Sequence, residues 1–291
     1  MATLRDIKRK IEAVKKTAQI TRAMNMVAAA KLRGAQANME KFHPYADKFR
    51  EVIERLAAGV EQDGTFELLT PREEVRKIEL VLLTADRGLC GSFNNNLIML
   101  AEKFMEEKAA EGKEVTLICA GRKGHEYFRK RRFAIRKRYT GLLNKPNYED
   151  AYNLGREVIE LFQTGEADEV YLIYAQFVSM LRQVPTLIRL LPVVPESRGD
   201  EDRQIDYIFE PSHEVLLNDL LPNYVYVQIL ESFYQTAVSE HAARMTAMDN
   251  ATNNCNEMVR DLTLVFNKAR QASITKELMD IVGGAEALKK K

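Results

Sequence analysis

The sequence is poor in the residues that build disulfide frameworks and metal centres. Its three cysteines, Cys90, Cys119 and Cys255, lie far apart and form no Cys-x-x-Cys pair. This spacing argues against a disulfide framework or a cysteine zinc site and favours a reducing compartment. The histidines also lack a Cys or a second His at ligand spacing. We therefore expect no metal ion and treat each histidine as structural: His43, His125, His213 and His241.

Long apolar runs are missing as well. No stretch of about 20 uncharged apolar residues occurs, so the sequence predicts no membrane span. The first residues include Arg5 and Asp6 and lack the apolar run of a secretory signal. We expect any contact with a membrane to go through a partner protein.

What is present is an ordinary globular composition, with 46% hydrophobic residues and a formal net charge of +1 over 291 residues. That length fits one large domain or two modest ones. The sequence divides into three segments: a helical segment at 1–60, an α/β domain at 76–195 and a second helical segment at 212–291.

The first segment carries a heptad pattern behind a possible helix cap at Thr3 and Asp6. No proline occurs before Pro44. Such a long repeat with spacings of three and four is typical of a coiled coil. One heptad position reads Leu4, Ile11, Ala18, Asn25, Leu32 and Met39, and the other reads Ile7, Val14, Thr21, Ala28, Ala35 and Phe42.

The last segment has a similar pattern. Pro222 suits a first helical turn, and neither proline nor glycine follows until Gly283-Gly284, which we expect to end the helix. The first predicted heptad position reads Val227, Tyr234, His241, Met248, Cys255, Leu262 and Ala269. The second reads Leu230, Ala237, Arg244, Ala251, Met258, Val265 and Ala272.

A long helix does not bury its apolar stripe alone. The two helical segments are therefore predicted to pair with each other as an antiparallel coiled coil, with the inserted middle domain to one side. The alternative is two separate amphipathic helices on a globular core.

The middle segment alternates strands and helices, which predicts an α/β fold, Rossmann-like, with a mostly parallel sheet. The predicted strands are 78–84, 115–120, 133–139, 169–177 and an extended stretch at 184–194. The predicted helices cover 93–111 and 148–162, and a shorter one begins at 121–124.

The turn at 86–92 joins a strand to a helix, where phosphates often bind. It matches neither G-x-G-x-x-G nor G-x-x-x-x-G-K-[ST], so we favour a structural turn over a phosphate site. Within it, Cys90 is either a nucleophile with a lowered pKa or a small buried thiol, and we favour the thiol.

Charge is unevenly distributed. Residues 5–33 carry nine Lys or Arg against Asp6 and Glu12, and residues 122–138 are also basic. Such helices bind nucleic acid in some proteins, but without a DNA-binding motif a solvated or partner-facing helix face is the better interpretation. The acidic stretch 196–219 is predicted to be a surface loop.

Four motifs, found in order along the whole chain, resemble F-type ATP synthase gamma subunits. They are the opening helix with residues 20–31 (ITRAMNMVAAAK), the turn 84–91 (TADRGLCG), residues 240–248 (EHAARMTAM) and the closing motif 269–278 (ARQASITKEL) with Gly283-Gly284 behind it. The chain lacks the inserted cysteine pair of green-plant plastid forms. The resemblance is therefore to bacterial forms.

The resemblance implies a central rotor shaft without a catalytic site, cofactor or metal of its own. The shaft would couple proton or sodium flow through the c-ring to ATP synthesis or hydrolysis at the beta subunits, and would regulate both. The implied partners are three alpha and three beta subunits, the epsilon subunit and the c-ring, at the cytoplasmic face of the bacterial plasma membrane. The implied beta-facing residues are Met24, Arg244, Arg270, Gln271 and Thr275, and Tyr207 and Glu210 would face the c-ring or epsilon.

Two other classes stay open on the residues alone. One is an enzyme with a regulatory coiled coil, against which the missing phosphate loop counts. The other is a nucleic-acid binder built on the basic helix, against which the small net charge counts.

Overall fold

The computed structural model describes residues 3–58, 66–131, 133–194 and 213–289. Contacts between residues divide the chain into two compact units. The first, called the stem here, combines residues 1–27 with 245–291, and the second, called the body, contains residues 28–244. Two long helices, α1 (Leu4–Ala58) and α5 (His213–Lys289), contribute to both units.

The stem is an antiparallel pair of helices, as predicted. The hydroxyl oxygen of Thr21 lies 2.7 Å from that of Thr252, and the Asn25 amide donates to the carbonyl oxygen of Met245 at 2.9 Å. The buried and half-buried residues of α1 follow the predicted heptad. In the stem they include Leu4, Ile7, Ile11, Val14, Ala18, Thr21 and Asn25.

The second predicted heptad position of α5 holds as far as the half-buried Ala251 and is wrong beyond it. The structure leaves Met258 47% exposed and Val265 52% exposed, and Ala272 is exposed too. The half-buried residues in their place are Thr252, Val259, Phe266 and Ser273. The bond between Thr21 and Thr252 gives the reason, because it turns a polar residue of α5 toward α1. A prediction from apolar character alone therefore selects the wrong residues of α5 for the face that packs on α1.

Both ends of α5 also differ from the prediction, whereas α1 lies within the predicted segment 1–60. Pro44 and Pro222 lie inside their helices, and α5 continues through Gly283 to Lys289. A proline removes one backbone hydrogen bond, and burial of Leu217, Leu221 and Val225 on both sides of Pro222 compensates by packing. A glycine costs about 1 kcal/mol in a helix without forcing an end.

The acidic stretch 196–219 was predicted to be a loop, and its last residues contradict this. Residues 213–219 form the first turns of α5. Residues 196–212 lie outside the described part of the chain.

The body is built on a five-stranded sheet with the order β3-β2-β1-β4-β5. The strands are β1 (Lys77–Leu83), β2 (Glu114–Ala120), β3 (Ala134–Tyr139), β4 (Glu169–Phe177) and β5 (Gln183–Leu191). The first four run parallel, and β5 runs antiparallel to β4. The predicted α/β fold with a mostly parallel sheet is therefore confirmed.

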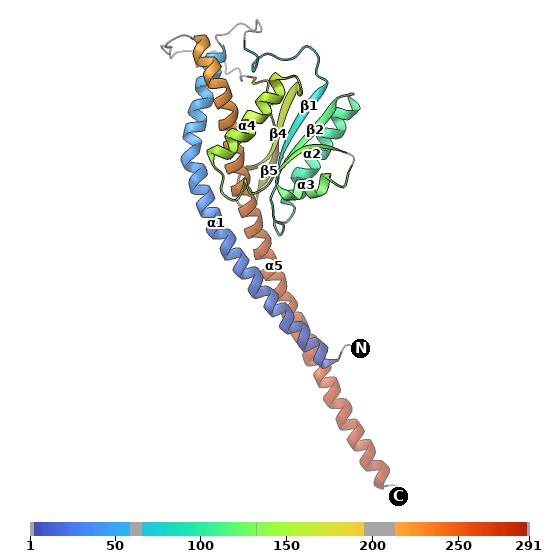
Figure 1. Ribbon diagram of the computed structural model, residues 1–291. Coiled ribbons are helices and arrows are strands. Elements are labelled where there is room, and N and C mark those ends of the chain that lie inside the picture. Colours follow the sequence, from blue (N-terminus) through green and yellow to red (C-terminus); the bar gives the residue numbers. More distant parts are fainter. Residues whose placement is uncertain (1–2, 59–65, 132, 195–212, 290–291) are drawn as a thin grey trace. The chain divides into compact units, whose positions relative to one another are not determined.

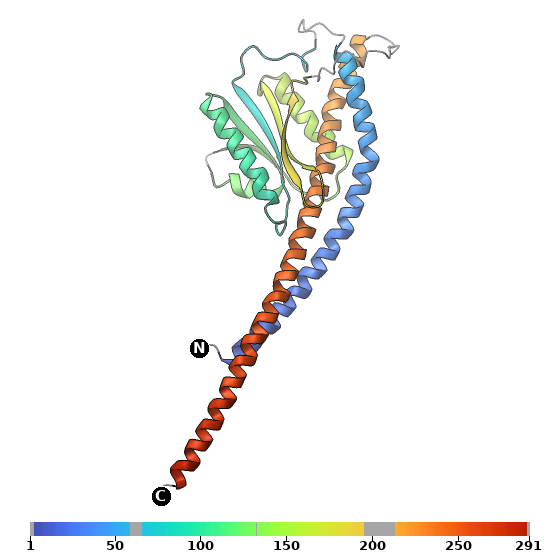
Figure 2. The ribbon, with the colours of Figure 1, turned by 180° about the vertical axis from the view of Figure 1, so that it is seen from behind.

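Helices cover both faces of this sheet (Figure 1). Helices α2 (Phe93–Ala110) and α3 (Arg122–Phe128) pack on one face, around Leu80, Leu82 and Leu117. Helix α4 (Tyr148–Gln163) packs on the other, around Val81 and Leu172. The body portions of α1 and α5 join this second core and lie side by side on the α4 face (Figure 2).

Polar side chains of α5 also bond to the backbone of β4. Pairing between β1 and β4 ends at Ile173, so β4 continues past its neighbour. Beyond that point the Ala175 amide donates to the Thr236 hydroxyl at 3.2 Å, and the Ser239 hydroxyl donates to the Ala175 carbonyl at 3.1 Å. These bonds explain why Thr236 and Ser239 are fully buried in α5.

Candidate functional site

The turn that carries the most specific motif lies at the carboxyl end of β1. It connects β1 to α2 and contains two residues in left-handed backbone conformation, Leu89 with φ 63° and Gly91 with φ 60°. Leu89 is 62% exposed. This conformation is uncommon for a residue with a side chain. The turn therefore has a specific shape, which the surrounding hydrogen bonds explain.

Thr84 begins the turn and fixes the neighbouring β2–α3 connection. Its hydroxyl accepts from the Gly124 amide at 2.9 Å. Gly121 has φ 133°, and a Cβ atom there would lie 2.0 Å from the carbonyl oxygen of Thr84. Only glycine allows this close approach of two backbones.

Both carboxylate oxygens of Asp86 bond to backbone amides outside the turn, at the start of α3 and after β3. One oxygen accepts from the Arg122 amide at 2.9 Å and the other accepts from the Gly141 amide at 2.8 Å. A bound phosphate would need amide donors of this kind and would be repelled by the carboxylate. The geometry therefore supports a structural turn.

Cys90 is buried, and its thiol fits the structural interpretation too. The Asn94 amide group donates to its Sγ at 3.2 Å, and the Asn94 carbonyl accepts from the Ala85 amide at 2.9 Å. Burial raises the pKa of the Cys90 thiol, with the charge of Arg244 acting in the opposite direction. A raised pKa keeps the sulfur protonated and disfavours a nucleophilic role.

Arg244 connects α5 to this turn. Its guanidinium forms an ion pair with Glu240 at 2.7 Å and donates to the carbonyl oxygens of Arg87 at 3.4 Å and Gly88 at 3.3 Å. Only 13% of the Arg244 side chain is exposed. The structure thus shows Arg244 engaged within the body, and its predicted contact with a beta subunit stays a prediction.

Two ionisable neighbours of Arg244 are buried in α5. Burial raises the pKa of Glu240, while Arg244 acts to lower it. Burial, together with the charges of Arg244 and Lys31, lowers the pKa of His241 to about 4. The His241 imidazole is therefore neutral near pH 7. Its Nδ1 is buried without a hydrogen-bond partner among the described residues.

The remaining beta-facing residues of the prediction lie in the stem. Met24 is half-buried in α1, while Arg270, Gln271 and Thr275 are exposed on α5. The structure does not bring these two groups together. The bonds of Thr21 to Thr252 and of Asn25 to Met245 place Met24 opposite residues 246–249, and Arg270 lies roughly 32 Å or more farther along the axis at 1.5 Å per residue.

The residues predicted to face the c-ring or epsilon, Tyr207 and Glu210, lie outside the described residues. The basic cluster of the first segment is described, and all nine of its Lys and Arg side chains are exposed: Arg5, Lys8, Arg9, Lys10, Lys15, Lys16, Arg22, Lys31 and Arg33. Among the helices that the structure describes, none is long and apolar enough to cross a membrane.

Beyond Ser273, α5 exposes a run of large apolar side chains. Leu278, Met279 and Ile281 are 57%, 69% and 68% exposed, and Ile274 and Val282 are at least half exposed. Exposed apolar residues gathered in one segment are typical of a surface that a partner covers. This segment includes the second half of the closing motif, residues 274–278.

The sequence analysis missed the groups that attach α5 to the body. The Gln235 side chain accepts from the Phe177 amide at 3.0 Å, beside the bonds made by Thr236 and Ser239. The sequence did contain a sign of these bonds, because Gln235, Thr236 and Ser239 are polar residues in an otherwise apolar part of α5. Their partners on β4 lie about 60 residues away in sequence, which a local pattern does not reveal.

Comparison with known sequences places the chain in one family. The family model described as ATP synthase matches residues 3–288. The ATP synthase gamma chain of Syntrophobacter fumaroxidans is 71% identical and covers 100% of both chains. That of Nitratidesulfovibrio vulgaris (strain Hildenborough) is 50% identical and covers 99% of this chain and 100% of its own.

Solved structures share the fold at lower identity. A chain of the Euglena gracilis mitochondrial ATP synthase (OSCP/F1/c-ring, rotational state 3) matches with a TM-score of 0.65 at 18% identity, covering 98% of this chain and 94% of that one. A chain of the Tetrahymena thermophila mitochondrial ATP synthase (central stalk/c-ring) matches with a TM-score of 0.59 at 23% identity, covering 80% and 99%. With a matching family model and full-length relatives, the chain belongs to the gamma chains of F-type ATP synthase, the subunits of its central stalk.

Proposed function

We propose that this chain is a rotor shaft that transmits rotation between a membrane ion channel and catalytic sites held by other subunits. The observation that carries the proposal is helix α5. Over 235–244 it is bonded to the body by the side chains described above, and from there it continues as one helix to Lys289. A torque applied to the body therefore acts directly on the stem helix, with no connecting loop to absorb it.

The chain acts without a catalytic site of its own. The turn with the most specific motif has its carboxylate, its thiol and its Asn94 side chain bonded within the body. Because these polar groups are bonded within the body, their role is to hold the turn in shape. Chemistry would take place on the partner subunits.

The partners are three alpha and three beta subunits around the stem, with epsilon and the c-ring against the body. Exposed apolar residues beyond Ser273 and the exposed Arg270, Gln271 and Thr275 support the alpha and beta contact. Met24 and Arg244 would contribute to it from farther along the stem and from the edge of the body. Tyr207 and Glu210 would contact the c-ring or epsilon.

The mechanism follows from asymmetry. A shaft with three identical neighbours presents a different face to each. It changes nucleotide affinity only if those faces contact the neighbours differently, because an effector shifts an equilibrium by its differential binding energy. The exposed basic residues of α1 and Arg270 would supply such contacts to carboxylates of the beta subunits.

The location is peripheral, at the cytoplasmic face of a bacterial plasma membrane, and the membrane contact runs through the c-ring. The coupling ion is a proton or sodium. The same shaft would regulate ATP hydrolysis and ion flow, because it links the two.

The test is co-expression of this chain with alpha and beta subunits from the same source, followed by affinity purification and an ATPase assay. We expect one copy per three alpha and three beta subunits, and loss of hydrolysis when the chain is omitted. The double variant Arg270→Ala/Gln271→Ala should lower hydrolysis by about tenfold, equivalent to about 1.4 kcal/mol. Arg138→Ala, an exposed arginine on β3, is the matched control and should have no effect.

A chain that failed to co-purify, yet bound nucleotide or duplex DNA alone, would overturn the shaft and favour an enzyme or a nucleic-acid binder. Normal assembly and hydrolysis in the double variant would retain the shaft but contradict the role of Arg270 and Gln271.

A further inference from the structure

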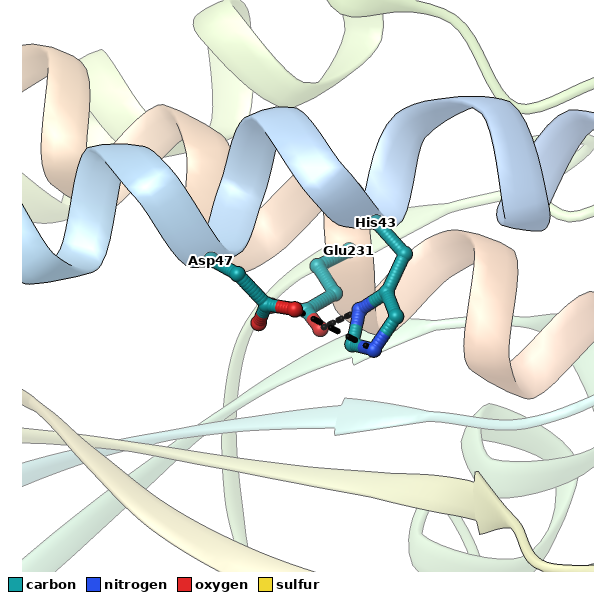
Figure 3. A group of neighbouring side chains, drawn as sticks. All are labelled: His43, Asp47 and Glu231. Atoms are coloured by element: carbon teal, nitrogen blue, oxygen red, sulfur yellow. Dashed lines mark ion pairs between the residues drawn. The ribbon is translucent and has the colours of Figure 1, made fainter.

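Three metal-ligating side chains converge where the body portions of α1 and α5 lie side by side (Figure 3). His43 and Asp47 are one helical turn apart on α1, and Glu231 comes from α5. The distances are 3.4 Å from His43 Nε2 to Asp47 Oδ2 and 3.4 Å from His43 Nδ1 to Glu231 Oε1. One ligand atom from each residue lies within 4.8 Å of the others.

Arg50 donates hydrogen bonds to both carboxylates, through the oxygens that do not face His43. Its guanidinium donates to Glu231 Oε2 at 2.8 Å and to Asp47 Oδ1 at 3.3 Å. The other oxygen of each carboxylate, Glu231 Oε1 and Asp47 Oδ2, is the one that faces His43. Such outer bonds orient ligating carboxylates in metal sites.

The net charge of this cluster and its access to solvent both permit a cation to bind. The two carboxylates outweigh the single charge of Arg50, so the cluster is net negative when His43 is neutral. His43 and Asp47 are about half exposed, whereas Glu231 is 14% exposed. His43, Arg50 and Glu231 also line a cavity of about 610 Å³ that Tyr174 and Gln228 help to enclose. An ion therefore has an entry path, and water has room to complete its coordination.

We propose that His43, Asp47 and Glu231 form a binding site for one divalent transition-metal ion, which links α1 to α5. Ligands about 2.0–2.2 Å from one tetrahedral ion lie about 3.3–3.6 Å apart. Each carboxylate here lies 3.4 Å from a different ring nitrogen of His43, and one ligand atom from each of the three residues lies within 4.8 Å of the others, so binding one ion requires the three side chains to close slightly. One ring nitrogen would bind, after a small rotation of the exposed imidazole. A nitrogen ligand with two carboxylates favours an ion such as Zn²⁺ over Mg²⁺ or Ca²⁺.

The site is invisible to a reading of spacing alone. His43 and Asp47 look like an ordinary i, i+4 pair on a solvated helix face. The third ligand lies on the other long helix, and Arg50 and Glu231 are 181 residues apart in sequence.

The test is a calorimetric titration of Zn²⁺ into the untagged full chain, stripped of metal with EDTA and then dialysed. We expect one ion per chain and a rise of the thermal unfolding midpoint with Zn²⁺. His43→Ala and Glu231→Gln should each weaken binding by about tenfold or more and remove that rise. Circular dichroism without metal should match the wild type for both variants, because the ligands lie at the surface of the helix pair.

Two variants serve as matched controls. His125→Ala removes a histidine on α3, and Cys255→Ser removes a partly exposed thiol in the stem. Both should bind Zn²⁺ as the wild type does. The proposal is wrong if His43→Ala keeps wild-type affinity, if Cys255→Ser abolishes binding, or if the wild type binds Zn²⁺ no more tightly than Mg²⁺. Any of these results would leave His43, Asp47, Arg50 and Glu231 as an ion-pair network only.

Discussion

The stem and the body share the two long helices, α1 and α5, but are stabilised in different ways. In the body, two clusters of fully buried side chains pack on the faces of the sheet. In the described part of the stem, the buried residues are Ile7, Thr21 and Met248, and many large apolar side chains are exposed. The body therefore contains its own core, whereas the stem exposes large apolar side chains, which is typical of a surface that a partner covers. Stability and function should separate along this division.

The largest effect should come from removing a core side chain of the body. Phe162 is fully buried on α4, so Phe162→Ala should lower the free energy of unfolding by about 4 kcal/mol. Leu264, 69% exposed in the stem, is the matched control, and Leu264→Ala should change the stability of the isolated chain by less than about 0.5 kcal/mol. Urea unfolding measures both. If both variants lost a similar free energy of unfolding, the body and the stem would not differ in how they are stabilised.

A backbone change at the turn should have nearly as large an effect. Gly121→Ala places a Cβ against the Thr84 carbonyl in a strained conformation and should cost about 3 to 4 kcal/mol. Gly165 also has a positive φ, 72°, but nothing lies within 4 Å of its Cβ position. Gly165→Ala should therefore cost only about 1 kcal/mol. Equal costs, measured by thermal and urea unfolding, would show that close approach of the two connections is unimportant.

A buried carboxyl gives the body a pH dependence of its own. Burial raises the pKa of Glu79, on β1, to about 7, and the bond from Arg136 acts in the opposite direction. Because the folded-state pKa lies above the ordinary value of 4.5, this group's stabilising contribution is present below pH 4.5 and is lost as pH rises toward 7. The loss is about 3 kcal/mol.

Glu79→Gln should remove that slope. Urea unfolding of wild type and variant at pH 5 and pH 7.5 measures it, and Glu114→Gln, an exposed glutamate on β2, is the control that should keep the wild-type slope. A variant with an unchanged slope would assign the pH dependence to other groups.

The smallest effect should come from the stem's own hydrogen bond. Thr21→Val removes the bond to Thr252 and should cost about 1 kcal/mol at most in the isolated chain. Thr17→Val, at an exposed position of the same helix, is the control. Local hydrogen exchange near Thr252 is the suitable measurement, because unfolding of the whole chain reports mainly on the body. A change in exchange across the body would show that the two units unfold together.

The sequence predicted the elements of the body well because its signals are local. The central strand β1, for example, contains the apolar run 80–83, and the burial pattern of α1 follows its heptad. The division into segments 1–60, 76–195 and 212–291 stays a prediction.

The errors and omissions share a physical cause. The face of α5 beyond Ala251 depends on the pairing of Thr21 with Thr252, and the attachment of α5 to the sheet depends on the carbonyl and amide of Ala175. Each is a contact between distant segments, and propensity or periodicity contains no information about such partners. The turn at 86–92 was predicted in part. Its glycines indicate a turn in the sequence, but the bonds from Arg122 and Gly141 to Asp86 are contacts between distant segments.

The stem's two helices come from opposite ends of the chain, and this has a consequence for biosynthesis. The bond between Thr21 and Thr252 forms only after Thr252 has been synthesised, because the two residues are 231 positions apart in sequence. The body ends at residue 244, so its core is complete earlier on the ribosome. A ready-folded body holds the start of α5 in place and reduces the loop-closure entropy that this distant pairing would otherwise cost. The stem residues of α1 are therefore synthesised well before their partners on α5, and the stem pair forms only after the body.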